Sequence, residues 1–134
     1  MRATSYTAAA ASTLLAVIHL VLAPDSFEDA TYLGVLFVVG AVLLLGVAYT
    51  VLRRPSTWAW LLGSAVSAGM FLGFVLSRTT GLPGFREESW EPAGWASLVL
   101  ELVFLAAAAR ALGSSATSRP GGGRKRQPPT PRRQ

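Results

Sequence analysis

The chain has 134 residues, of which 51% are hydrophobic and 14% charged, and its formal net charge is +5. It contains no cysteine, which excludes disulfides, thiolate metal sites and cysteine nucleophiles and leaves the redox compartment undefined. The apolar residues form long runs separated by short polar connections, a pattern typical of a membrane protein rather than a soluble globular domain.

Four apolar runs predict an all-α fold. Each is close to the roughly 20 residues that cross about 30 Å of hydrocarbon as a helix, and open strand edges cannot satisfy their backbone groups in lipid. The runs comprise residues 6–23, 30–52, 57–77 and 93–112. Pro24, Pro55, Arg78 and Pro92 lie at their boundaries, where a helix is expected to end or begin. We therefore expect residues 1–112 to form a four-helix transmembrane bundle.

The first run has an alternative interpretation as a secretory signal peptide. It is short, follows Arg2 and ends in Val21-Leu22-Ala23, which is a small-residue cleavage pattern. Pro24 directly after the candidate site argues against cleavage, and removal of this run would leave an odd number of spans that conflicts with the charge distribution. We therefore interpret it as a retained span.

Residues 113–134 predict a disordered basic tail. They consist largely of Ser, Gly, Pro and Arg and contain no large apolar residue, so they cannot bury enough surface to offset the entropy of ordering. Their basic residues are expected to meet anionic lipid headgroups. Nucleic acid is not an expected partner, because no aromatic residues are interleaved for base stacking.

The distribution of basic residues predicts the orientation. All of the 12 Lys and Arg residues except Arg78 and Arg86 fall on one side of the predicted spans, and cytoplasmic loops retain positive charge. Aromatic residues, which favour membrane interfaces, are expected at that boundary (Tyr6, Tyr49, Trp58 and Trp60) and at the opposite one (Tyr32, Trp90 and Trp95). We expect a multi-pass plasma-membrane protein with both termini in the cytoplasm.

Small residues mark one face of the third run. Ala65, Gly69 and Gly73 recur at intervals of one helical turn, and such ridges allow backbones to approach closely in lipid. Two interpretations stay open, namely packing within one bundle and a seam between copies of the chain.

His19, Arg78 and Glu101 are the residues most suggestive of chemistry. Glu101 lies about 12 Å along its helix from Ala93, and His19 about 6 Å from Ala23. Helical side chains lean toward their own N terminus, which brings the three side chains toward a common depth. A buried carboxylate is costly in lipid, so we expect Glu101 to be protonated or paired with Arg78 or His19.

This polar cluster has two interpretations. It either relays protons or binds a ligand, or it is a structural clasp that fixes helix register. A metal or cofactor is not expected, because one His with scattered carboxylates lacks the spacing of a metal site. No P-loop, dinucleotide fingerprint, nucleophile elbow or zinc-protease helix is present, which makes an enzyme the less favoured class.

Several short segments carry a resemblance. They read VIHLVLAP at residues 17–24, SRTTGLPG at 77–84, WEPAG at 90–94 and LEL at 100–102. These segments resemble a group of small four-span actinobacterial integral membrane proteins whose function is unassigned. The resemblance covers the spans but not the tail, and it implies the same architecture and interest in His19, Arg78 and Glu101, without implying a reaction.

Three hypotheses for function follow. The preferred one is a non-enzymatic bundle that binds a small ligand or a partner through its outer polar cluster, as an accessory subunit or as a homo-oligomer. The second is a proton-coupled transporter or channel component. The third is a membrane enzyme in which Glu101 and His19 act as acid and base.

Overall fold

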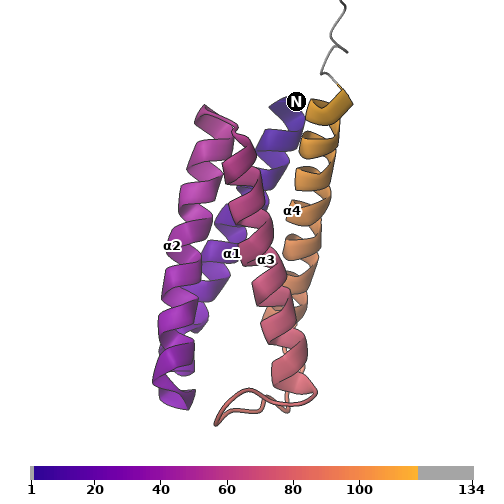
Figure 1. The fold of residues 1–134 in the computed structure, drawn as a ribbon. Coiled ribbons are helices and arrows are strands. Elements are labelled where there is room, and N and C mark those ends of the chain that lie inside the picture. Colours follow the sequence, from indigo (N-terminus) through magenta and orange to yellow (C-terminus); the bar gives the residue numbers. More distant parts are fainter. Residues whose placement is uncertain (1, 118–134) are drawn as a thin grey trace, which may run out of the picture.

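The structure, a computed structural model, describes residues 2–117, and these residues are all-helical apart from short connections. The four helices are α1 (Arg2–Asp29), α2 (Thr31–Arg53), α3 (Thr57–Arg78) and α4 (Pro92–Thr117). They run up and down in turn, so that neighbours along the chain are antiparallel (Figure 1). This confirms the predicted all-α four-helix bundle.

All four helices are long and apolar enough to cross a membrane. Their outward faces carry many exposed aliphatic side chains, among them Val21, Val42, Leu72 and Val99, which are 57–69% exposed. A surface of this kind would be a large apolar patch in water but matches the hydrocarbon of a bilayer. The chain is therefore a multi-pass membrane protein.

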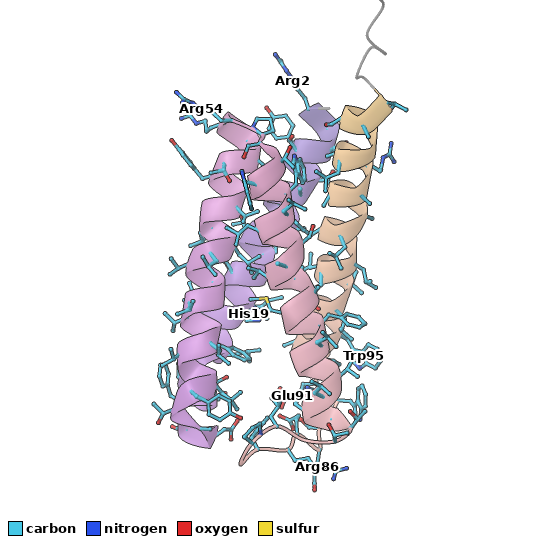
Figure 2. The ribbon with its side chains drawn as sticks, in the orientation of Figure 1. Arg2, His19, Arg54, Arg86, Glu91 and Trp95 are labelled. Atoms are coloured by element: carbon cyan, nitrogen blue, oxygen red, sulfur yellow. The ribbon has the colours of Figure 1, made fainter. Side chains whose placement is uncertain are left out.

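The two ends of the bundle differ in charge. Arg2 and Arg54 lie at one end, together with the last turn of α4, and we call this the basic end (Figure 2). Arg86 and Glu91 lie at the other end, where residues 79–91 connect α3 to α4, and we call this the loop end. Among residues 2–117, the antiparallel helices thus place most of the basic residues at one end of the bundle.

Two observed helix ends, those of α1 and α4, differ from the predicted ones. Pro24 was expected to end the first span, but α1 continues through it to Asp29, where Ala30 N–H donates to Ser26 O at 3.1 Å. Membrane helices tolerate proline when neighbouring groups compensate for its missing N–H. α1 therefore has 28 residues, or about 42 Å, and extends beyond the hydrocarbon.

α4 is longer than expected at its C-terminal end. Residues 113–117 were assigned to a disordered tail, yet they continue the helix to Thr117. The hydroxyls of Ser114, Ser115 and Thr117 donate to carbonyls one turn earlier, which satisfies them inside the helix. The remainder of the predicted tail, residues 118–134, lies outside the described residues.

The packed core lies toward the basic end and the middle of the bundle. One cluster joins Phe104, Trp60, Val47 and Val51 to alanines of α1, α2, α3 and α4, and a second joins Leu15, Ala16, Ala41 and Leu44. Alanines allow the close helix approach on which association in lipid depends. Trp60, which was expected at an interface, is instead 5% exposed within this core, its ring centroid 6.1 Å from that of Phe104.

The helices separate toward the loop end. α2 and α3 are close where residues 54–56 join them and diverge toward the opposite end, where residues 79–91 cross over (Figure 1). Both core clusters lie away from this region. The space between the diverging helices is where the candidate site is found.

Candidate functional site

A cavity of about 610 Å³ occupies the loop-end half of the bundle. All four helices and the connection between α3 and α4 line it, so it is a product of the whole fold. Its walls are largely apolar, and they include Leu36, Phe37, Val66, Met70 and Phe74. His19, Arg78 and Glu101 all line this cavity, so the structure brings the predicted polar residues to one site.

His19 lies on α1 and is 6% exposed. Its Nδ1 lies 2.9 Å from Leu15 O, and because a carbonyl oxygen only accepts, Nδ1 carries the proton in this bond. The ring is stabilised by Phe37, whose centroid is 4.8 Å away at an interplanar angle of 42°. In the neutral ring, Nε2 is left as a hydrogen-bond acceptor, and Figure 2 places His19 between the helices.

Glu101 lies on α4 and is 1% exposed. Within residues 2–117 its Oε2 is buried and has no hydrogen-bond partner. A buried polar atom without a partner costs about 1–3 kcal/mol, and more when it is charged. Glu101 is therefore not held by a clasp, because nothing in the described chain forms the second half of one.

Arg78, at the end of α3, is engaged elsewhere. Its Nε donates to Ser89 O at 3.1 Å and its Nη1 donates to Ser77 Oγ at 3.1 Å. The guanidinium also lies 3.8 Å from the ring centroid of Phe74 and 5.8 Å from that of Trp90. The expected pairing of Glu101 with Arg78 or His19 is not found among residues 2–117, since the bonds of these side chains go to other groups.

The connection between α3 and α4 is fixed at several points. Leu82 and Phe85 exchange backbone hydrogen bonds of 2.7 and 3.0 Å around a turn in which Gly84 has φ +69°. The Tyr32 hydroxyl donates to Pro83 O at 2.7 Å, which ties this turn to α2. Residues 79–91 thus bridge α3 and α2 across the loop end of the cavity.

Glu87 is also ordered within this connection. The Ser89 hydroxyl and the Ser89 N–H donate to its Oε1 at 2.6 and 2.8 Å. These hydrogen bonds, with the hydroxyl as the larger cause, lower the pKa of Glu87 below the usual range. Glu87 is therefore ionised at neutral pH and adds negative charge where the cavity meets the loop end.

Arg78→Lys is expected to loosen this connection. Lysine keeps the charge but loses the planar fork that donates to both Ser77 and Ser89, so we expect stability to fall by about 1–2 kcal/mol. Amide hydrogen exchange of residues 82–90 should accelerate. Arg86→Lys, at an exposed position of the same connection, is the matched control and should leave exchange unchanged. Equal exchange in the two variants would show that Arg78 is not the anchor.

The small residues of α3 form part of the cavity wall. Ala65, Gly69 and Gly73 line the cavity, and a Cβ placed at Gly69 or Gly73 would have no atom within 4 Å. The prediction that these glycines pack against a neighbouring helix is therefore wrong for the described chain. They provide open volume instead, and a seam between two copies of the chain stays a prediction.

Other glycines make the close contacts between elements. A Cβ at Gly34 would meet Phe27, at Gly40 Met70, at Gly63 Phe104, and at Gly94 Phe74. Sequence reasoning did not single out Gly34, Gly40 or Gly63. Gly63 also belongs to a small-residue ridge, with Ala59 and Ser67 one turn to either side. The cation–aromatic cluster around Arg78 was also missed, although Trp90 and Trp95 near an arginine were a usable signal.

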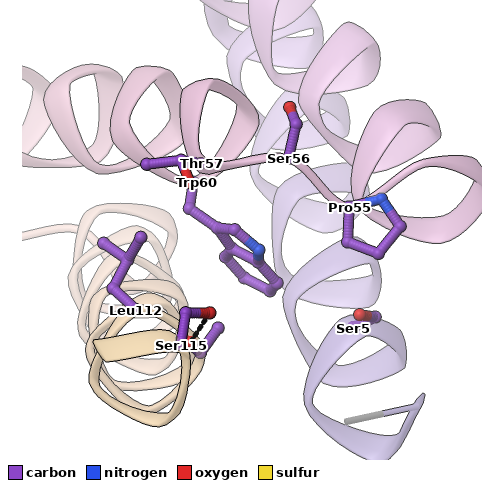
Figure 3. Close-up of a pocket in the computed structure, with 8 residues that line it drawn as sticks. Ser5, Pro55, Ser56, Thr57, Trp60, Leu112 and Ser115 are labelled. Carbon is purple, nitrogen blue, oxygen red and sulfur yellow. Dashed lines mark hydrogen bonds between the residues drawn. The ribbon is translucent and has the colours of Figure 1, made fainter. Parts of the chain in front are cut away.

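A second, smaller cavity of about 210 Å³ lies at the basic end, between the starts of α1 and α3 and the end of α4 (Figure 3). Two of its hydroxyls already serve local structure. Ser56 Oγ accepts from Ala59 N–H at 3.2 Å, and Ser115 Oγ donates to Ala111 O at 3.0 Å. No charged side chain lines it among the described residues, so it has fewer means of recognising a ligand than the larger cavity.

The fold and the larger cavity define the class of molecule: an all-helical, multi-pass membrane bundle that holds a buried acid and a buried histidine at the wall of one cavity. Residues 2–117 contain no group of His, Asp and Glu side chains arranged to hold a metal ion. Comparisons with protein families, with curated proteins and with solved structures find no match. The resemblance of the short segments to actinobacterial membrane proteins stays a prediction.

Proposed function

We propose that this protein is a non-enzymatic plasma-membrane protein whose cavity at the loop end binds a small molecule with an apolar body. The observation that carries the proposal is the cavity itself, about 610 Å³ in volume, with Glu101 unpartnered at its wall. Sites for small molecules are typically concave, about 300–1,000 Å³ in volume, mostly apolar and furnished with a few polar groups. The cavity has each of these properties.

The orientation we propose puts the basic end, and with it both chain termini, in the cytoplasm. Support comes from the charge difference between the two ends, since positive residues are retained on the cytoplasmic side. The cavity then lies in the outer half of the membrane. Its ligand is accessible from the outer leaflet or the external medium, and lipids are the immediate neighbours of the bundle.

Gly73→Leu tests whether the cavity is the binding site. A leucine there would occupy the cavity without meeting another atom at its Cβ, so the protein should fold while the binding volume shrinks. Gly46→Leu is the matched control, because Gly46 is an equally open helical position of α2 that faces outward. Both variants should show the helical spectrum of the wild type.

The probe is tritiated decanol, measured by equilibrium binding to protein in phosphatidylcholine nanodiscs after subtraction of empty discs. We expect saturable binding to the wild type and to Gly46→Leu, and binding at least about tenfold weaker to Gly73→Leu, because the added side chain excludes the probe. Equal binding to all three proteins would contradict the proposal. If copies of the chain associate through this face, Gly73→Leu would instead change the oligomeric state seen by native mass spectrometry.

A transport function has one observation in its favour, which is that Glu101 and His19 line the same cavity. Against it, the core around Phe104, Trp60 and Val47 packs side chains of all four helices together in the basic-end half of the described bundle. Proton uptake by liposomes containing the protein decides the matter. Uptake that disappears in Glu101→Gln would favour transport over simple binding.

A role as accessory subunit of a larger complex uses the same cavity. In that case an apolar side chain or helix of the partner, rather than a free molecule, would occupy it. Repeated copurification of one partner complex from native membranes, reduced by Gly73→Leu but not by Gly46→Leu, would favour this alternative.

A further inference from the structure

We infer that the cavity selects amphipathic amines, because the unpartnered Glu101 carboxyl and the free acceptor nitrogen of His19 line one apolar chamber whose mouth is acidic. This inference rests on the proposed function and names the chemical class of its ligand: an apolar body that carries a protonated amine.

Two acceptors at the wall lack donors. Glu101 is 1% exposed and its Oε2 makes no hydrogen bond within residues 2–117. His19 uses its Nδ1 proton on Leu15 O, so its Nε2 remains an acceptor. An ammonium group has several N–H donors and a positive charge, so its chemistry complements a carboxylate and also an imidazole nitrogen that accepts a hydrogen bond.

The chain itself supplies no cation for Glu101. Arg78 is the one basic side chain that lines the cavity among the described residues, and Ser77, Ser89 and the ring of Phe74 already engage its guanidinium. Moving Arg78 to Glu101 would break both hydrogen bonds, including the one that ties Ser89 of the connection to α3. The carboxyl is thus left for a cation that comes from outside the protein.

The mouth of the cavity favours cations. Asp25 and Asp29 of α1 line it, as do Glu87 and Glu91 of the loop end, against the single positive charge of Arg78. Hydrogen bonds from Ser89 lower the pKa of Glu87, which keeps this carboxylate charged. A mouth lined by one sign of charge concentrates counter-ions of the opposite sign, and it repels anionic amphiphiles.

The body of the ligand would lie against apolar walls. Leu36, Phe37, Val66, Met70 and Phe74 face the same chamber, and the open Cβ positions of Gly69 and Gly73 leave room beside α3. The Glu101 side chain is already buried in the folded protein, and a cationic head group beside it would supply the opposite charge that a buried carboxylate requires. The site is preorganised for a charged head on an apolar body.

The test compares tritiated decylamine with tritiated decanol in nanodiscs of zwitterionic phosphatidylcholine, after subtraction of empty discs. The two probes share the apolar chain and differ in the head group. We expect wild-type protein to bind decylamine at least about tenfold more tightly than decanol, as a charge-assisted hydrogen bond provides. In Glu101→Gln, the affinity for decylamine should fall at least about tenfold, because the carboxylate that pairs with the ammonium group is lost.

The outcomes separate the two proposals. Gly73-dependent binding of decanol without preference for decylamine would overturn the amine inference and leave the proposed function standing. Binding of both probes that is insensitive to Gly73→Leu would overturn the proposed function. Glu101→Asp keeps the carboxylate on a shorter side chain and serves as the second variant: retention of part of the amine preference supports the inference, and decylamine affinity equal to that of Glu101→Gln contradicts it.

Discussion

Phe104→Ala is expected to lower the free energy of unfolding by about 3 kcal/mol. Phe104 is completely buried and joins α4 to α3, where its ring fills the space left by Gly63 and packs against Trp60. Truncation leaves a void that the neighbouring helices cannot close. This loss of stability is at the low end of the range for aromatic truncations. Lipid tails are as apolar as the core, so the variant loses mainly packing energy and little hydrophobic free energy.

Reversible unfolding in mixed micelles of detergent and dodecyl sulfate measures this difference. Leu102→Ala is the matched control, because Leu102 lies on the same helix but is 55% exposed toward lipid, and its truncation should change stability by about 0.5 kcal/mol or less. A loss for Phe104→Ala no larger than that of the control would show that the core does not hold α3 and α4 together.

Glu101→Leu is expected to stabilise the protein by about 1–3 kcal/mol, an unusual sign for a substitution at a buried position. The carboxyl at this position makes no hydrogen bond through Oε2 within residues 2–117, and it lines a cavity that can accept a leucine. Removing an unsatisfied polar group relieves its desolvation cost. A structural clasp predicts the opposite sign, since cutting a hydrogen-bonded clasp destabilises.

The same unfolding measurement in the absence of added amine gives the sign. Ser97→Ala is a useful companion, because Ser97 lines the cavity on the same helix and its change should be small. A loss of stability in Glu101→Leu would mean that the carboxyl has a partner in the folded protein, and would favour the structural role. Stabilisation together with loss of decylamine binding is the pattern of a site kept for function at the expense of stability.

The fold was largely predictable from hydropathy, because the positions of apolar runs determine which segments cross the lipid. Runs of about 20 apolar residues must be helices, so the positions of α2 and α3 follow from composition to within one residue. The extent of α1 and α4 was not predictable in the same way. Pro24 usually marks an end, and Gly113 usually begins a connection, but bundle packing and side-chain hydrogen bonds continue both helices.

The site was predictable in its residues but not in its form. His19 and Glu101 stand out because ionisable groups are rare in apolar runs, and both line the cavity. The sequence does not predict that α2 and α3 diverge, so no feature of the sequence indicated a cavity between the helices. Without it, Gly69 and Gly73 were interpreted as a packing ridge, and Arg78 as a partner for Glu101 rather than the anchor of residues 79–91.

These corrections share a physical cause. A small residue in a membrane helix permits close approach but does not require it, so the neighbour decides whether the position is a contact or a void. Gly40 and Gly63 lie under Met70 and Phe104, whereas Gly69 and Gly73 have no neighbour. The choice depends on helix rotation and crossing, which are set by the whole bundle and not by the local sequence.

The proposed function depends on a cavity among the four helices that opens at the outer face of the membrane, and thiol accessibility tests this opening most directly. The chain has no cysteine, so Gly73→Cys and Gly46→Cys each introduce a single thiol into an otherwise unreactive protein. A charged methanethiosulfonate reagent added outside intact cells should modify position 73 and spare position 46, which faces hydrocarbon. Equal protection of both positions, or modification of position 73 only after the cells are opened, would contradict the account.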